Sequence, residues 1–228
     1  SLYLAISGRP GPVLLDIPVD IQRAEIDPNK LNGFKIPSSD INSISSEQLD
    51  AKLEKLYLDI QKSERPVFLI GGGVRNAEAI DELHELGKIL EIPMYPTWNA
   101  LDVVTSDYKY YCGRVGTYGG AGRNFGIQNS DLLISIGSRI SGRITGGNVK
   151  TFARKAKKYM VDVDPGVLKK EFQQVPFDEN INCDAKKFIN IFKKYLIKKK
   201  YKTESKKTKW LKRCVEWKEI YDPVKSDY

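Results

Sequence analysis

The stretch that most constrains this chain runs from Leu132 to Gly147, LLISIGSRISGRITGG. Its first five residues, 132–136, form a short uncharged apolar run, which predicts a strand buried on both faces, as in a parallel sheet. Glycine, small hydroxyl side chains and arginine follow. Because ligands of open α/β sheets bind beyond the carboxyl ends of the strands, Arg139 and Arg143 are candidate phosphate ligands. The alternative is a surface loop with two solvated arginines.

Similar patterns recur along the chain and indicate the fold class. Apolar positions at helical spacing predict a helix over 46–62, and Asn76 is expected to cap a second helix that ends near Leu90. A last strand and helix are expected within 180–196. Four or five alternations of strand and helix favour an α/β fold with a doubly wound parallel sheet. The further predicted strands are residues 13–17, 67–70, 92–95 and 159–163.

A glycine turn follows the strand at 67–70. Gly71, Gly72 and Gly73 permit a tight turn, and free N–H groups at the start of the next helix favour phosphate. The dinucleotide motif GxGxxG is incomplete, because Asn76 stands at its third glycine. Thr97, rather than an acidic residue, follows the next strand, so an ordinary NAD site is not indicated.

Two other segments have open alternatives. Asp162 and Asp164 stand at the end of the predicted strand 159–163, where they either cap the strand or hydrogen-bond a ribose or adenine. Residues 112–131 contain six glycines, which suit either a flexible loop or a close approach of the backbone to a ligand.

Charge is unevenly distributed. Residues 186–218 hold fourteen Lys/Arg against two Asp/Glu, a local +12, so the remaining residues carry −4 of the total +8. A nucleic-acid-binding protein would have to rely on this basic segment alone. We favour a solvated helix and linker, because the segment carries no interleaved aromatic face.

Composition narrows the class of protein further. A hydrophobic content of 41% permits a real core, and no apolar run is long enough to cross a membrane. Three widely spaced cysteines without a CxxC pair fit a reducing, cytoplasmic setting. His84 is the only histidine, which argues against a histidine triad or zinc site. The N-terminal residues do not have the sequence pattern of a signal peptide, and the sequence starts part-way through an apolar stretch without an initiator methionine. We therefore expect a piece of a longer chain.

Several motifs in order resemble the thiamine diphosphate-dependent enzymes of the acetolactate synthase type. They are GRPGPVLLDIPVDIQ, RPVFLIGGG, the glycine-rich segment, SDLLISIGSRISGRITGG, MVDVDP and CDAKKFI. The resemblance implies that residues 1–28 are the tail of an N-terminal pyrimidine-binding domain. It also implies that residues 29–60 are a linker and helix, that residues 61–197 are a Rossmann-like central domain, and that residues 198–228 are a basic linker toward a diphosphate-binding domain. This last segment is expected to pack poorly and to be cleaved near Lys200.

The resemblance also implies a cofactor site in the central domain, with FAD first and ADP second. FAD has no net redox role in the family's main reaction. Relative to the family, Tyr118 replaces a histidine, Ser141 and Gly142 replace an acidic pair, and Lys30 stands where an arginine is usual. The positions carried over are Gly71, Gly72, Gly73, Thr97, Asn99, Gly116, Tyr118, Gly119, Gly137, Ser138, Arg139, Arg143, Asp162 and Val163.

By the same resemblance, the full-length enzyme decarboxylates a 2-keto acid and joins the remainder to a second carbonyl compound. It would use thiamine diphosphate and Mg²⁺ at sites outside these residues, as a homodimer or homotetramer without nucleic-acid or membrane partners. The alternative is a nucleotide-binding module of similar fold without thiamine chemistry. No catalytic residue is assigned within this chain.

We therefore expect the 228-residue chain alone to be inactive. The family's chemistry needs an early glutamate and a GDG motif, and neither is present in this sequence. The measurement is CO₂ release from pyruvate with added thiamine diphosphate and Mg²⁺. Release above a no-protein control would contradict the expectation.

Overall fold

The computed structural model describes residues 1–7, 9–36, 44–116 and 120–222, and it divides into two compact units, Ser1–Ile41 and Asn42–Tyr228. The first unit contains α1 (Leu2–Ile6), α2 (Val19–Gln22) and the short 3-10 helix η1 (Pro28–Lys30). Residues 13–17 are exposed and not in a strand, so that prediction is wrong. A strand is stable only within a sheet, and the described part of this unit offers it no partner.

The second unit is built on five parallel strands in the order β2-β1-β3-β4-β5. Every residue of β1 and β3 is buried, as their uncharged sequences predict. The predicted doubly wound parallel sheet is confirmed. Because β2 lies on one side of β1 and β3 on the other, the topological switch point falls between β1 and β3. The strands are β1 (Pro66–Ile70), β2 (Met94–Pro96), β3 (Leu132–Ile136), β4 (Lys157–Asp162) and β5 (Glu179–Asn182).

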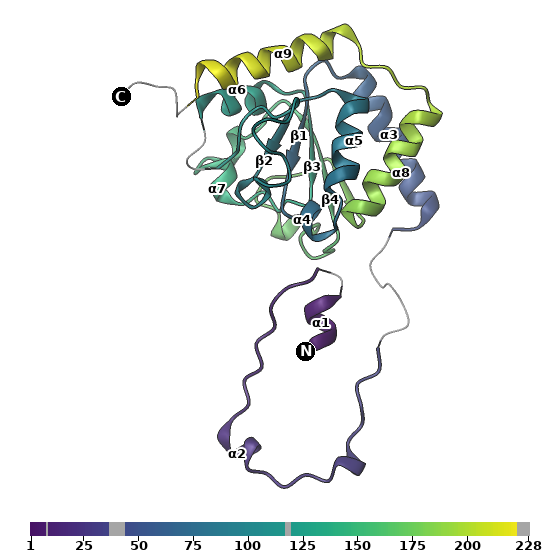
Figure 1. Cartoon of the computed structure of the whole chain (residues 1–228), viewed down its shortest axis with the longest axis vertical. Helices are drawn as coiled ribbons and strands as arrows, with labels where there is room; N and C mark the ends of the chain where they lie inside the picture. The colour runs from purple at the N-terminus through teal and green to yellow at the C-terminus, as the bar shows by residue number, and fades with distance from the viewer. Residues whose placement is uncertain (8, 37–43, 117–119, 223–228) are drawn as a thin grey trace. The chain divides into compact units, whose positions relative to one another are not determined.

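Three helices, α3 (Ser46–Lys62), α5 (Ile80–Leu90) and α8 (Ala185–Lys198), form a layer beside the sheet (Figure 1). The α3 helix begins where predicted, because the Ser45 hydroxyl accepts a hydrogen bond from the Gln48 N–H at 3.2 Å. Its leucines at positions 49, 53 and 56 are buried, so α3 belongs to the unit that contains the sheet. The division between units thus falls after Ile41, whereas the sequence placed the start of the central domain at 61.

The helix expected to start at Asn76 is interrupted. The glycine turn continues directly into α4 (Gly73–Asn76), because the Asn76 N–H donates to the Gly72 carbonyl at 3.1 Å. Glu78 then adopts a left-handed backbone with φ 51°, and α5 begins after Ala79. Asn76 therefore ends a short helix, and its prediction as an N-cap is wrong.

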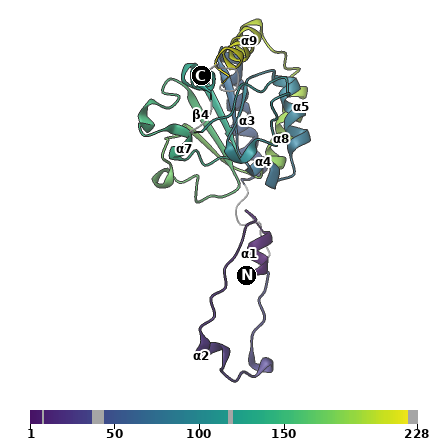
Figure 2. The same cartoon turned by 60° about the vertical axis from the view of Figure 1, so that its left-hand side comes forward.

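Two further helices pack against each other, α6 (Ala121–Asn129) and α9 (Ser205–Ile220) (Figures 1 and 2). In α9, Trp210 is 7% exposed and donates from its indole N–H to the Pro66 carbonyl at 3.1 Å. A glycine at 122 permits close contact, since a Cβ there would lie 2.4 Å from the Trp217 carbonyl oxygen. The prediction that residues 198–228 pack poorly is therefore wrong for the described part of this segment.

The remaining short elements of this unit are α7 and three 3-10 helices. Their bounds are α7 (Gly142–Thr145), η2 (Trp98–Ala100), η3 (Val149–Thr151) and η4 (Lys170–Phe172). None of the helices in the described part of the chain is both long enough and apolar enough to cross a membrane.

The backbones of two turns lie close together at the switch point. The Gly71 N–H donates to the Ile136 carbonyl at 2.9 Å, and a Cβ on Gly71 would lie 2.0 Å from the Gly137 oxygen. Gly137 itself adopts φ 64°, a left-handed conformation that favours glycine. Both positions therefore require glycine for reasons of packing and backbone conformation.

We expect Gly71→Ala to lower the free energy of unfolding by about 2 kcal/mol or more, because the added methyl group must displace backbone rather than a flexible side chain. Urea unfolding followed by circular dichroism measures the change. Gly147→Ala is the matched control: no atom lies within 4 Å of its Cβ position, so its effect should stay within about 0.5 kcal/mol. Equal stability of the two variants would contradict the packing argument.

Candidate functional site

The predicted site residues that follow the strands meet at one edge of the sheet. Backbone hydrogen bonds extend the ladder one residue beyond the strands and place Thr97, Gly71 and Gly137 side by side. Asp162, the last residue of β4, completes the row. The bonds run from Thr97 N–H to the Ile70 carbonyl (2.8 Å), from Gly71 N–H to that of Ile136 (2.9 Å) and from Gly137 N–H to that of Val161 (2.9 Å).

The glycine turn is held by its neighbours. The Gly73 N–H donates to the Gly137 carbonyl at 3.1 Å, so this donor is already satisfied within the protein. A Cβ on Gly72 would lie 2.8 Å from the Asn99 carbonyl oxygen, which shows how closely the turn after β2 approaches. Close packing therefore accounts for the glycines, and their contact with phosphate stays a prediction.

The two predicted arginines are exposed. Arg139 lies in the loop after β3, and Arg143 lies in α7. Ser138, which stands in the sequence between β3 and Arg139, is buried. Its hydroxyl accepts a hydrogen bond from the Ile140 N–H at 3.4 Å. The loop is thus anchored by its serine while both guanidinium groups face solvent, where an anionic ligand can reach them.

Asp162 is 8% exposed, and its carboxylate accepts from the Asp164 N–H at 3.0 Å. Asp164 in turn accepts from the Gly166 N–H at 2.8 Å. Both aspartates therefore cap the end of β4, which confirms the structural interpretation; a bond to ribose or adenine stays a prediction. Val163 is half-buried, and its carbonyl accepts from the Asn182 side chain at 3.0 Å.

The glycine-rich segment reaches the same edge by running alongside β2. The Met94 N–H donates to the Tyr110 carbonyl at 2.8 Å, and the Val115 N–H donates to the Pro96 carbonyl at 2.9 Å. Gly116 therefore lies beyond the end of β2. Tyr118 and Gly119, the other predicted contacts in this segment, fall outside the described residues.

Arg123 is a residue of this region that the sequence did not single out. Its guanidinium is 8% exposed and donates to the carbonyl oxygens of Gly120, at 2.7 Å, and of Gly116. Burial lowers the pKa of Arg123, and the nearby positive charge of Arg114 lowers it further. One buried arginine thus hydrogen-bonds the backbone of residues 116 and 120 and holds them together. The sequence offers no motif that would distinguish this arginine from a solvated one.

Arg75 was also missed. Its guanidinium donates to the Asn99 carbonyl at 3.0 Å and pairs with Asp102 at 2.6 Å. The side-chain hydrogen bond from Arg75 lowers the pKa of Asp102. Arg75 therefore ties the turn after β2 to the helix that follows the glycine turn.

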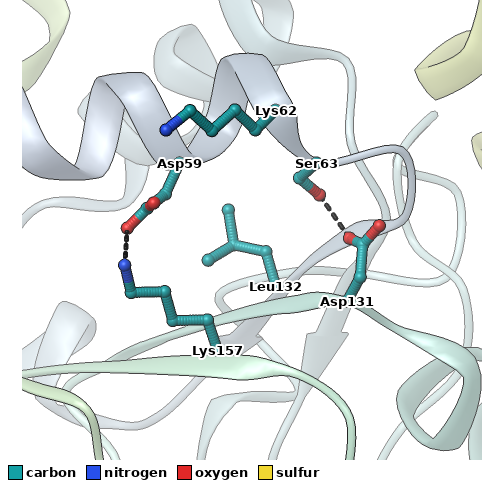
Figure 3. Close-up of a pocket in the computed structure, with 6 residues that line it drawn as sticks. All are labelled: Asp59, Lys62, Ser63, Asp131, Leu132 and Lys157. Carbon is teal, nitrogen blue, oxygen red and sulfur yellow. Dashed lines mark hydrogen bonds and ion pairs between the residues drawn. The ribbon is translucent and has the colours of Figure 1, made fainter.

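A small pocket of about 180 Å³ lies at the opposite, amino-terminal edge of the sheet (Figure 3). Leu132 and Lys157, the first residues of β3 and β4, line it together with Asp59, Lys62, Ser63 and Asp131. The Lys157 ammonium pairs with Asp59 at 2.6 Å, and Asp131 accepts from the Ser63 hydroxyl. Four of its polar side chains are thus engaged with each other, so we assign this pocket no function.

Among the described residues, no three His, Cys, Asp or Glu side chains are grouped so as to hold a metal ion.

Comparison with known proteins identifies the family. Residues 53–191 match the family described as "Thiamine pyrophosphate enzyme, central domain". The chain therefore belongs to the thiamine pyrophosphate enzymes, in which this region is the central domain.

Several curated proteins are similar to the chain. The acetolactate synthase large subunit of Corynebacterium glutamicum is 39% identical over 175 residues, which are 75% of this chain and 26% of that protein. The large subunit of acetolactate synthase isozyme 2 of Escherichia coli is 36% identical over 167 residues, 73% of this chain and 29% of that protein. A probable acetolactate synthase large subunit of Methanocaldococcus jannaschii is 35% identical over 227 residues, 98% of this chain and 37% of that protein. The chain thus spans about a third of the length of these relatives.

We expect Arg123→Met to destabilise the fold, because it removes the buried guanidinium that donates to the backbone carbonyls of Gly116 and Gly120. The loss should be about 1–3 kcal/mol in the free energy of unfolding. Arg139→Met, an exposed arginine, is the matched control and should change stability by less than about 0.5 kcal/mol. Urea unfolding compares the two; a neutral Arg123→Met would show that this arginine does not support the segment.

Proposed function

We propose that the full-length protein is a thiamine diphosphate-dependent, acetolactate synthase-like enzyme. It decarboxylates a 2-keto acid and joins the product to a second carbonyl compound, a reaction type suggested by its similarity to acetolactate synthase large subunits. Membership of the thiamine pyrophosphate enzyme family supports the cofactor. Thiamine diphosphate supplies the decarboxylation chemistry when bound, and we place it, with Mg²⁺, at sites formed by other parts of the protein. We further propose a cytoplasmic enzyme that is a homodimer or homotetramer.

Within that enzyme, this chain contributes a nucleotide-binding central domain, with FAD as the first ligand and ADP as the second. The observation that carries this proposal is the presence of two exposed arginines, Arg139 and Arg143, on the segment that follows β3, one of the two strands at the switch point of the sheet. Ligands of doubly wound sheets bind in the crevice at this position. FAD would have a structural role here, because no step of the proposed reaction requires it to be reduced.

The residues present fit the phosphate and ribose parts of such a ligand. Arg139 and Arg143 can each donate charge-assisted hydrogen bonds to a diphosphate. The Asp162 carboxylate, which accepts from the Asp164 N–H at the end of β4, is the acceptor type that a ribose hydroxyl needs. The Gly73 N–H is donated to Gly137, so we assign the diphosphate to the arginines rather than to that donor.

The test is titration calorimetry of the 228-residue chain with FAD, ADP and NAD, repeated on Arg139→Ala and Arg143→Ala. FAD or ADP should bind, and each substitution should weaken binding about tenfold to a hundredfold, the worth of a charge-assisted bond of about 1.5–3 kcal/mol. NAD is the control ligand and should bind more weakly.

Assays of the full-length protein distinguish the two parts of the proposal, which are the thiamine-dependent activity and the nucleotide binding by the central domain. Production of CO₂ from a 2-keto acid, dependent on thiamine diphosphate, supports the enzymatic assignment whatever the central domain binds. Nucleotide binding without any such activity supports instead a nucleotide-binding module without thiamine chemistry. If no nucleotide binds, or if both arginine variants bind normally, the central domain is not a nucleotide site.

A further inference from the structure

Two of the three cysteines of the chain lie together beneath α9. Cys112 is held beside β2, because its backbone N–H donates to the Met94 carbonyl at 3.0 Å. Cys214 lies in α9, one helical turn before Lys218, whose ammonium lies 5.7 Å from the ring centroid of Tyr111. Residues four apart share a face of a helix, so Cys214 and Lys218 face the segment that contains residues 111 and 112. Both cysteines are fully buried.

The hydroxyl of Tyr95 shares this buried space. Tyr95 belongs to β2, and its hydroxyl reaches α6, where a Cβ on Gly126 would overlap the hydroxyl oxygen. Burial raises the pKa of Tyr95, and the nearby thiols of Cys112 and Cys214 raise it further. The tyrosine and the two cysteines therefore form one buried cluster between β2, α6 and α9.

The packed fold keeps the two thiols unreactive. Burial raises the pKa of the Cys112 thiol, and the neighbouring Cys214 raises it further. Because the thiolate rather than the thiol reacts with oxidants, the pair is inert while α9 is docked.

The helix that covers the pair can open without unfolding of the sheet. The helix contacts of α9 are chiefly with α6, and its ion pair between Lys206 and Glu64 lies at the surface. Elements held by few partners open locally at a lower free energy than that of global unfolding. Opening of α9 would expose both cysteines to solvent, so their reactivity depends on the position of this helix.

We propose that Cys112 and Cys214 form a redox-sensitive latch, in which a peroxide converts the two thiols to a disulfide that fixes α9 to the glycine-rich segment. When α9 is open, one thiolate attacks a peroxide oxygen, the O–O bond breaks, and a sulfenic acid and hydroxide form. When α9 docks again, the second thiol attacks the sulfenic sulfur and releases water as the S–S bond forms. The two thiols together lose two electrons and two protons, and hydrogen peroxide is reduced to two waters.

This latch is independent of the proposed nucleotide site. In a reducing setting the pair stays as thiols, so the disulfide forms only when an oxidant is present. The link would then join α9 to residue 112, at the start of the segment that runs alongside β2 toward Gly116.

The test treats the 228-residue chain with hydrogen peroxide and identifies the products by mass spectrometry without reduction. The expected product is a single chain that has lost two hydrogens and yields one linked pair of peptides, containing residues 112 and 214. Cys112→Ala and Cys214→Ala should each abolish this product. Cys183→Ala is the matched control, because Cys183 is also buried, directly after β5, and its removal should leave the product unchanged.

Two further measurements test the latch itself. A disulfide that closes a loop of about a hundred residues restricts the unfolded chain, so oxidation should raise the Tm by about 5 °C or more. Dithiothreitol should reverse the rise. Trp210→Phe removes the hydrogen bond from α9 to the Pro66 carbonyl and should speed disulfide formation about fivefold, the worth of one hydrogen bond.

Several outcomes overturn the inference. Sulfenic or sulfinic acid without the linked peptides, or links between two chains only, would show that the two thiols do not meet. A disulfide that lowers the Tm would be a strained bond rather than a latch. An unchanged rate in Trp210→Phe would show that access to the thiols does not depend on α9. The linked peptides are identified in the unchanged chain, so the test stands even where a cysteine variant fails to fold.

Discussion

The structure depends on the direct approach of two backbone segments at the switch point of the sheet. A Cβ on Gly71 would overlap the Gly137 carbonyl, a Cβ on Gly137 would overlap the backbone of Gly73, and the Gly73 N–H donates to the Gly137 carbonyl across the same gap. This contact sets the positions of the turns after β1 and β3, and hence those of Ser138 and Arg139. The same glycines that suggest a ligand-binding loop therefore have a prior structural function, since the two turns could not meet without them.

Electrostatic pairing explains the uneven charge of the sequence. Several lysines of the basic segment pair with acidic residues on α3, on α5 and at residue 64, so the charges compensate between helices rather than along the chain. Such surface pairs contribute little stability each. The four pairs that reach beyond the segment are Lys186–Glu82, Lys193–Glu85, Lys199–Glu54 and Lys206–Glu64.

The sheet and the long helices α3, α5 and α8 could be predicted because their signals are local. Buried strands such as 132–136 are uncharged, and α3 repeats its leucines at helical spacing. The packing of α9 could not be predicted, because Trp210 donates to a carbonyl 144 residues away. The lysines of α9 also indicated a solvated helix. For the same reason Arg123 was missed: its function depends on two carbonyls that come within reach only after folding. The strand ends indicated where the candidate site lies, while the contacts of the Asp162 carboxylate and of the Gly73 N–H required the structure.

The bond between Trp210 and Pro66 has a consequence for synthesis of the chain. Pro66 is the first residue of β1, and its carbonyl receives the indole N–H from a helix made near the end of the described chain. A ribosome must therefore deliver nearly the whole unit before the start of β1 acquires this partner. Contacts of such long sequence separation slow folding. Until α9 emerges, the face of α6 that packs against it is uncovered on the nascent chain, and exposed apolar surface of this kind favours aggregation.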